Sequence, residues 1–161
     1  VELNIYSAIY SDDYLYFYHE LLDLVNSLGI NKIVNIIPDY FDDQESLNLL
    51  SKHDLIVFPY QESRESSSAS VRHGLATLQP VIVTPSSIFQ DLSGCVQYFS
   101  GFSSYDIADG ITEYFRNSYT QNNQHCDKNN SKKFEFINAH RFSRVGRRLL
   151  NIIDSLNINY S

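Results

Sequence analysis

A polar segment that follows the apolar run ending at Tyr60 carries the side chains best suited to bind a ligand. Glu65 stands directly ahead of a run of small residues, Ser66, Ser67, Ser68 and Ala69, which begins a helical pattern. Free backbone amides and the positive end of a helix dipole favour a phosphate or diphosphate, and small side chains let it approach the backbone. The Glu65 carboxylate could accept hydrogen bonds from ligand hydroxyl groups. A plain helix cap, with Glu65 complementing the dipole, explains the same residues equally well.

Two arginines and a histidine lie close to this segment in the sequence. Arg64 and Arg72 could neutralise the charge of a diphosphate leaving group, or could be ordinary exposed arginines. His73 could hydrogen-bond a ligand hydroxyl through a ring nitrogen. Farther upstream, Tyr40 and Phe41 could pack on a nucleotide base, although a turn that caps a helix is the simpler interpretation. These residues are therefore secondary candidates for binding.

Short β-branched runs alternate with helical patterns, and this alternation predicts an α/β fold. The runs are apolar on both alternations, as strands buried on both faces should be, and cover residues 3–10, 32–37, 55–60, 81–84 and 95–99. Helical periodicity covers residues 12–28, 44–52, 67–78 and 105–116. Strands that alternate with helices imply right-handed crossovers, and hence a doubly wound, mostly parallel sheet of about five strands.

The chain is predicted to divide into three regions. Residues 1–118 form the α/β domain, and residues 119–131, rich in Asn, Gln and Ser, form a polar loop. Residues 132–161 form a long amphipathic helix that packs on the same domain. We expect this helix to leave some apolar surface exposed and to dock through a stripe of apolar residues: Phe142, Val145, Leu149, and Ile152 or Ile153. Complete coverage of the sheet by the helix is the alternative.

Composition excludes several classes of protein. The 161 residues carry a net charge of −7, which disfavours a broad nucleic-acid or anionic-membrane surface. No apolar run approaches the length of a membrane span. Cys95 and Cys126 have no metal-ligand spacing, so we expect no metal, and a reducing cytoplasmic setting fits them, although a single disulfide remains an alternative. The chain contains no Met and begins inside a strand pattern, which suggests a domain excised from a longer protein.

The order and spacing of three segments resemble the second domain of retaining GT-B glycosyltransferases, the glycosyl transferases of group 1. These segments are an Asp-led apolar strand, a Glu-led loop and helix, and a Pro-Val-Ile strand, at residues 54–60, 65–76 and 80–85. The helix patterns at residues 43–53 and 142–156 match that family's flanking elements, so the resemblance covers most of the chain.

The resemblance implies a function. The chain would be the Rossmann-like, donor-binding half of a hexosyltransferase-like enzyme that moves a sugar from a nucleotide-diphospho-sugar to an acceptor in polysaccharide or glycoconjugate synthesis, without a cofactor or metal. The N-terminal acceptor domain is absent from this sequence, so the isolated chain should be inactive. Peripheral membrane association through that domain would be compatible with the resemblance.

Individual family residues carry over only in part. Glu65 matches the glutamate that contacts the donor sugar, whereas His73 stands eight positions later, where the family has a glutamate that holds the ribose. Leu78 replaces a glycine that precedes the Pro-Val-Ile strand, and the family's basic first strand is not visible. These departures leave open a degenerate binding module that keeps the fold without transferring sugar.

Two other α/β classes are excluded by missing residues. A receiver domain requires an Asp after the third strand and a Lys after the fifth, and neither is present. A dinucleotide-binding dehydrogenase requires a G-x-G-x-x-G turn, which the sequence lacks.

Overall fold

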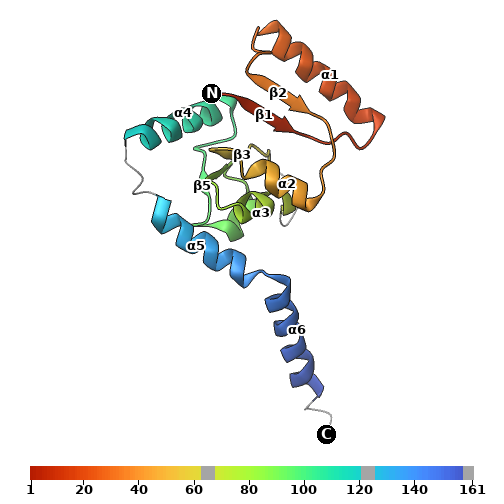
Figure 1. The fold of residues 1–161 in the computed structure, drawn as a ribbon, viewed down its shortest axis with the longest axis vertical. Helices are drawn as coiled ribbons and strands as arrows, with labels where there is room; N and C mark the ends of the chain where they lie inside the picture. Colours follow the sequence, from red (N-terminus) through yellow and green to blue (C-terminus); the bar gives the residue numbers. More distant parts are fainter. Residues whose placement is uncertain (63–67, 121–125, 158–161) are drawn as a thin grey trace. The chain divides into compact units, whose positions relative to one another are not determined.

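The computed structural model of the chain describes residues 1–62, 68–120 and 126–157. Strands and helices alternate through most of it (Figure 1), so the predicted α/β class is confirmed. The elements are β1 (Leu3–Tyr6), α1 (Asp12–Ser27), β2 (Val34–Ile37), α2 (Asp43–Leu50), β3 (Ile56–Phe58), α3 (Ala69–Ala76), β4 (Val81–Val83), the 3-10 helix η1 (Ser87–Leu92), β5 (Gln97–Tyr98), α4 (Ser104–Thr120), α5 (Cys126–Ala139) and α6 (Phe142–Asn157).

The strands pair in two sheets, of two and three strands, where one sheet of about five strands was predicted. The strand pairings within each sheet are parallel, as predicted. In one sheet β1 lies beside β2, with Leu3 opposite Val34. In the other, the order is β3-β4-β5, with Ile56 opposite Val81 and Val83 opposite Tyr98. The chain divides into two compact units, residues 1–46 and 47–161, which are described separately below.

The first unit contains β1, α1 and β2. Helix α1 begins with Asp12 and Asp13, whose negative charges suit the positive end of the helix dipole. It ends before Gly29, which has a φ of 67° and whose amide donates to the Asn26 carbonyl. Glycine adopts this left-handed conformation without steric cost, which is why the helix stops here and the chain turns into β2.

The second unit has a core built on both faces of its sheet. Alternate residues of β3 and β4 pack with α3 and η1 in one buried cluster: Ile56, Val81, Val83, Val71, Leu75, Ile88, Phe89, Leu92, Cys95 and Val96. Ile82 points to the other face, since successive strand residues alternate, and it is buried too. There α4 comes close to the sheet, and a Cβ added at Gly110 would lie 2.5 Å from Cδ1 of Phe99. Burial on both faces explains why β4 is apolar at successive positions.

The structure differs from the sequence prediction at residues 119–131. Helix α4 continues to Thr120 and α5 already begins at Cys126, where a polar loop was expected. Helix α5 contacts α3, and its Phe136 packs against the buried core cluster. Lys133 is also buried and donates to the Gln79 carbonyl at 2.8 Å. These tertiary contacts stabilise a helix that its Asn-rich sequence does not favour by itself.

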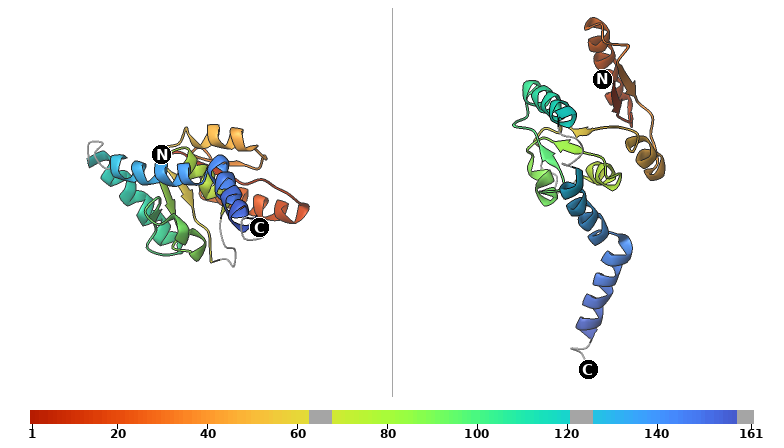
Figure 2. Two further views of the ribbon diagram at one scale, coloured as in Figure 1. Left: turned by 90° about the horizontal axis from the view of Figure 1, so that it is seen from below. Right: turned by 60° about the vertical axis from the view of Figure 1, so that its left-hand side comes forward.

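The predicted C-terminal helix is two helices, and its expected docking through the stripe that begins at Phe142 is not observed. Helix α5 ends at Ala139 and α6 starts at Phe142, so the expected single helix is interrupted at residues 140–141, and Figure 2 draws two separate helices. Phe142 is 96% exposed, and the other large apolar residues of α6 are 43–60% exposed: Val145, Leu149, Leu150, Ile152, Ile153 and Leu156. The exposed apolar surface predicted here is therefore present, whereas packing on the core is made by α5. No helix within the described ranges is long and apolar enough to cross a membrane.

Candidate functional site

The carboxyl ends of β3 and β4 lie at one edge of the second sheet, because the two strands are parallel. In open parallel sheets, ligands bind at this edge. The chain leaves β3 toward Glu62 and leaves β4 through Thr84. Thr84 is fully buried, and its hydroxyl donates to the Tyr60 carbonyl at 2.5 Å. This hydrogen bond joins the two loops and fixes their relative positions.

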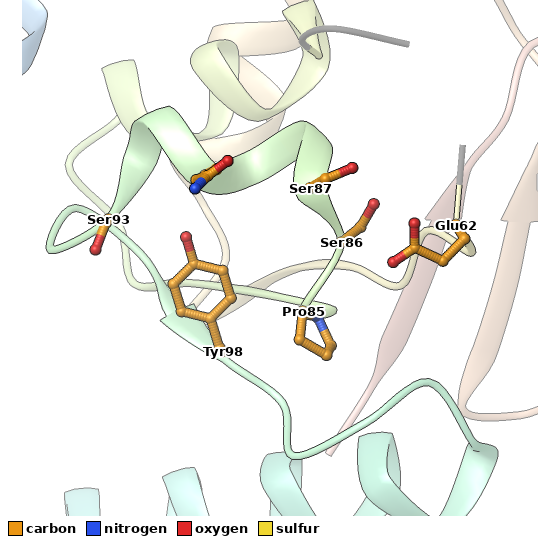
Figure 3. Close-up of a pocket in the computed structure, with 7 residues that line it drawn as sticks. Glu62, Pro85, Ser86, Ser87, Ser93 and Tyr98 are labelled. Carbon is orange, nitrogen blue, oxygen red and sulfur yellow. The ribbon is translucent and has the colours of Figure 1, made fainter. Parts of the chain in front are cut away.

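A pocket of about 430 Å³ opens at this edge (Figure 3). Its lining comes from the loops after β3 and β4, from η1, from the turn after η1 and from β5: Glu62, Pro85, Ser86, Ser87, Gln90, Ser93 and Tyr98. The Tyr98 hydroxyl donates to the Phe89 carbonyl at 2.8 Å, which fixes the ring at the wall. Burial, together with the charge of Asp91, raises the pKa of Tyr98, so the phenol stays neutral.

Ser86 is the unusual member of this lining. The residue is 3% exposed, and its hydroxyl oxygen has no hydrogen-bond partner within the described part of the chain. A buried hydroxyl left unpaired costs roughly 1–3 kcal/mol, which a ligand group could recover. Figure 3 shows Ser86 and Glu62 on the same side of the pocket. One signal in the sequence marks this wall, the small polar residues that follow β4, but nothing there singles out Glu62, Gln90 or Tyr98.

The predicted phosphate-binding segment is described only at its C-terminal end. Arg64, Glu65, Ser66 and Ser67 lie outside the described residues. Ser68 is the N-cap of α3, with an extended backbone at φ −112° and no hydrogen bond from its side chain to the helix. Helix α3 therefore starts at Ala69, within the stretch predicted to form a helix N-terminus.

Arg72 is held by residues of its own unit. One guanidinium nitrogen donates to the Ser68 carbonyl at 2.7 Å, and another forms an ion pair with Asp91 of η1 at 2.5 Å. The arginine therefore connects the first turn of α3 to η1. His73, the next residue, is half-buried on α3. Its neighbour Gly74 lies against β3, where an added Cβ would be 3.0 Å from the Phe58 ring.

The two predicted base-binding aromatic residues belong to the first unit, whereas the pocket belongs to the second. Phe41 makes an edge-to-face contact with Tyr6 at a ring separation of 6.0 Å. Tyr40 contacts Tyr10 at 6.4 Å and remains largely exposed. Both follow the carboxyl end of β2, in the position that sequence analysis assigned to them.

Leu78 has a left-handed backbone. Its φ is 64°, a conformation that glycine adopts freely and that bulky residues rarely adopt. Leu78 is also the position at which the sequence departs from the glycine of the GT-B domains it resembles. The backbone at this turn thus has the conformation that a glycine would favour, although the residue is a leucine.

The described residues offer no alternative chemistry based on a metal or a reactive thiol. Within them, no group of three His, Cys, Asp or Glu side chains is arranged to hold a metal ion. Cys95 is a free, buried cysteine, and burial raises the pKa of its thiol despite the opposing charges of Lys133 and Lys132. A raised pKa keeps the thiol protonated and unreactive.

Comparison with known proteins gives one similarity, and it is structural. No family model and no curated protein sequence matches the chain. The crystal structure of HepE (Alr3699) of Anabaena, in complex with UDP, is similar with a TM-score of 0.72 at 15% sequence identity. The match covers 96% of this chain and 41% of HepE, so the chain spans about two fifths of the length of that protein. The chain has the fold of the part of HepE that it matches.

Proposed function

We propose that this chain is the donor-binding half of a retaining GT-B glycosyltransferase, which transfers a hexose-like sugar from a nucleotide-diphospho-sugar to an acceptor in polysaccharide or glycoconjugate synthesis. The observation that carries the proposal is the position of the pocket. It lies at the carboxyl ends of parallel strands, in a fold shared with a part of HepE, whose structure contains UDP. Donor nucleotides bind at this edge in open α/β sheets.

In this proposal the start of α3 receives the diphosphate. The backbone amides around Ser68 and Ala69, with those of Ser66 and Ser67, donate to its oxygens, and the helix dipole favours its charge. Glu65 contacts the donor sugar and Arg64 neutralises the leaving group. Because Arg72 is paired with Asp91, its proposed role is to hold the start of α3 in place.

The remaining contacts of the donor are assigned by the same proposal. His73 hydrogen-bonds the ribose, and base packing by Tyr40 and Phe41 stays a prediction from the sequence. The chain works with an N-terminal acceptor domain of the same polypeptide and without a metal, and the free thiol of Cys95 agrees with a cytoplasmic location.

The diphosphate site is tested by a change of charge at Ala69. An Ala69→Asp substitution places a carboxylate in the first turn of α3, where it suits the helix dipole but repels an anion. We expect isothermal titration to show UDP binding at least tenfold weaker, about 1.4 kcal/mol, with no loss of thermal stability. Ala69→Asn is the matched control, because it has a similar size and no charge. Equal UDP affinity of all three proteins would refute a diphosphate site at this helix.

A non-catalytic binding module is the second candidate, favoured by the pairing of Arg72 with Asp91 and by His73 at the position of the family's second glutamate. The two candidates differ in the full-length protein. A glycosyltransferase releases UDP or another nucleoside diphosphate from its donor, and Glu65→Gln abolishes the release. A binding module binds the nucleotide without release. Measurable transfer by residues 1–161 alone would contradict the division into halves.

A further inference from the structure

We propose that Asp91 is a positioning residue for the start of α3: by holding the Arg72 side chain, it fixes the direction of a backbone amide before a ligand arrives. The inference rests on the proposed function, in which that amide belongs to the diphosphate site. The role falls on a residue of η1, which lies 19 positions beyond Arg72 in the sequence.

The first turn of α3 lacks the hydrogen bond that usually fixes the start of a helix. Ser68 is the N-cap, and a serine there commonly accepts a hydrogen bond from a backbone amide of the first turn. The Ser68 side chain makes no such bond. Ala69 and Ser70 are exposed, whereas Val71 and Leu75 are fully buried. The core therefore holds the later part of α3 and leaves its first residues to other contacts.

The Arg72 guanidinium supplies one such contact, at the Ser68 carbonyl. One of its nitrogens donates to this oxygen at 2.7 Å. The Ser68 carbonyl and the Ala69 amide belong to the same peptide group, which is planar and trans, so the N–H points opposite to the C=O. Holding the carbonyl therefore sets the direction of the Ala69 amide, which donates to the diphosphate in the proposed function.

Asp91 holds the other side of Arg72 from a well-anchored element. Its carboxylate forms an ion pair with a second guanidinium nitrogen at 2.5 Å. On η1, Phe89 and Leu92 are fully buried, and the Phe89 carbonyl accepts a hydrogen bond from the Tyr98 hydroxyl. The core therefore fixes η1 and its Asp91, Asp91 fixes Arg72, and Arg72 fixes the first turn of α3.

The ion pair acts on local geometry more than on the stability of the whole unit. The side chain of Arg72 is 32% exposed and that of Asp91 is 46% exposed. Ion pairs this accessible to water stabilise a fold only weakly, because solvent screens their charges. Loss of the Asp91 carboxylate should therefore loosen the first turn of α3 and leave the melting temperature nearly unchanged.

A direct role of Arg72 in anion binding makes the opposite prediction. Removing the Asp91 charge would release Arg72 for the diphosphate and would take a negative charge away from the same unit, so Coulomb attraction alone predicts tighter binding. Positioning predicts weaker binding, because the Ala69 amide loses its fixed direction. The sign of the change in affinity therefore distinguishes the two roles.

The test measures UDP binding by calorimetry and amide hydrogen exchange by NMR, both on the 161-residue chain. The variants are Asp91→Asn, which removes the charge at nearly constant size, Asp91→Glu, which keeps the charge, Arg72→Gln, and the double variant of Asp91→Asn with Arg72→Gln. Asp109→Asn is the matched control, because it removes the same charge from an exposed position on α4.

We expect Asp91→Asn and Arg72→Gln each to weaken UDP binding about two- to fivefold, the range set by exposed ion pairs. The double variant should bind no more weakly than the weaker single variant, because both changes break the same interaction. Asp91→Glu should keep most of the affinity, and Asp109→Asn should not weaken UDP binding.

Hydrogen exchange tests the positioning without any ligand. In Asp91→Asn the amides of Arg72 and His73 should exchange faster, because their helical acceptors are the carbonyls of Ser68 and Ala69. The amides of residues 75–76, whose acceptors lie farther along α3, should exchange as in the wild-type chain.

Several results would overturn the inference. Unchanged or tighter UDP binding by Asp91→Asn would do so, and so would an equal loss of affinity in Asp109→Asn or no better binding by Asp91→Glu than by Asp91→Asn. A clear fall in the melting temperature of Asp91→Asn would show that the pair stabilises the whole unit instead of one turn. Failure of the proposed function looks different: a wild-type chain that binds no UDP rejects the donor-binding role, and hydrogen exchange at Arg72 and His73 then decides by itself whether Asp91 positions the turn.

Discussion

The left-handed backbone at Leu78 predicts an unusual order of stability between two substitutions. Leu78→Ala and Leu78→Gly both remove the partly exposed side chain, but only glycine relieves the strain at a φ of 64°. That strain costs an L-residue roughly 1–2 kcal/mol, and glycine loses about 0.4–1 kcal/mol more chain entropy on folding than alanine. The glycine variant should therefore be more stable than the alanine variant by about 0.5–1 kcal/mol, the difference of those two estimates.

Urea unfolding followed by circular dichroism measures this difference. With a slope of about 1–3 kcal/mol per molar urea, the two midpoints should differ by roughly 0.2–1 M. Hydrogen exchange of the β4 amides, Val81–Val83, assigns the change to the second unit. Thr77 is the matched control, because its φ is −76° and both of its truncations remove the hydroxyl that donates to the Gly74 carbonyl. At Thr77 the order should be reversed, with alanine more stable. An alanine variant at position 78 as stable as the glycine variant would refute the strain.

Three further predictions concern stability. Hydrogen bonds from the Ser103 side chain and backbone, and from Ser100, lower the pKa of Asp106 below its usual 3.8. The stabilising effect of the Asp106 carboxylate is therefore present above that pH and is lost as the pH falls further. Asp106→Asn should make the melting temperature depend less on pH over this acid range, and an unchanged acid slope would refute the role of Asp106. Gly110→Ala should destabilise by about 1–3 kcal/mol because its Cβ meets the Phe99 ring, whereas Gly146→Ala, with nothing within 4 Å, should not, as urea midpoints will show. Deleting residues 140–161 should leave the melting temperature of the second unit nearly unchanged, since the apolar side chains of α6 are exposed. Deleting residues 132–161 should lower that melting temperature, because it also removes most of α5. An equal fall in melting temperature for both deletions would show that α6 is docked.

Local sequence patterns determined most of the secondary structure of this protein. The apolar runs predicted at residues 3–10, 32–37, 55–60 and 81–84 contain β1, β2, β3 and β4, because β-branched residues and flanking turn residues act within a few positions of the chain. Gly29 marked the end of α1 for the same local reason, a backbone conformation that glycine alone adopts freely. The parallel pairing followed from the alternation of strands with helices.

Tertiary contacts decided the parts that the sequence could not. The amphipathic pattern of the C-terminal region does not say which segment docks, and contacts of Lys133 and Phe136 placed that role in α5. The resemblance marked Leu78 as a departure from glycine, but its backbone angle became visible only in the folded turn.

The pocket illustrates the same limit. Glu62, Ser86 and Tyr98 lie far apart in the sequence, and each alone has the pattern of an ordinary surface residue. They line one open pocket because β3, β4 and β5 run parallel, so the loops after β3 and β4 and the end of β5 lie at one edge of the sheet. That the Ser86 hydroxyl has no partner among the described residues likewise depends on every neighbour that surrounds it, and no local pattern of residue types encodes that arrangement.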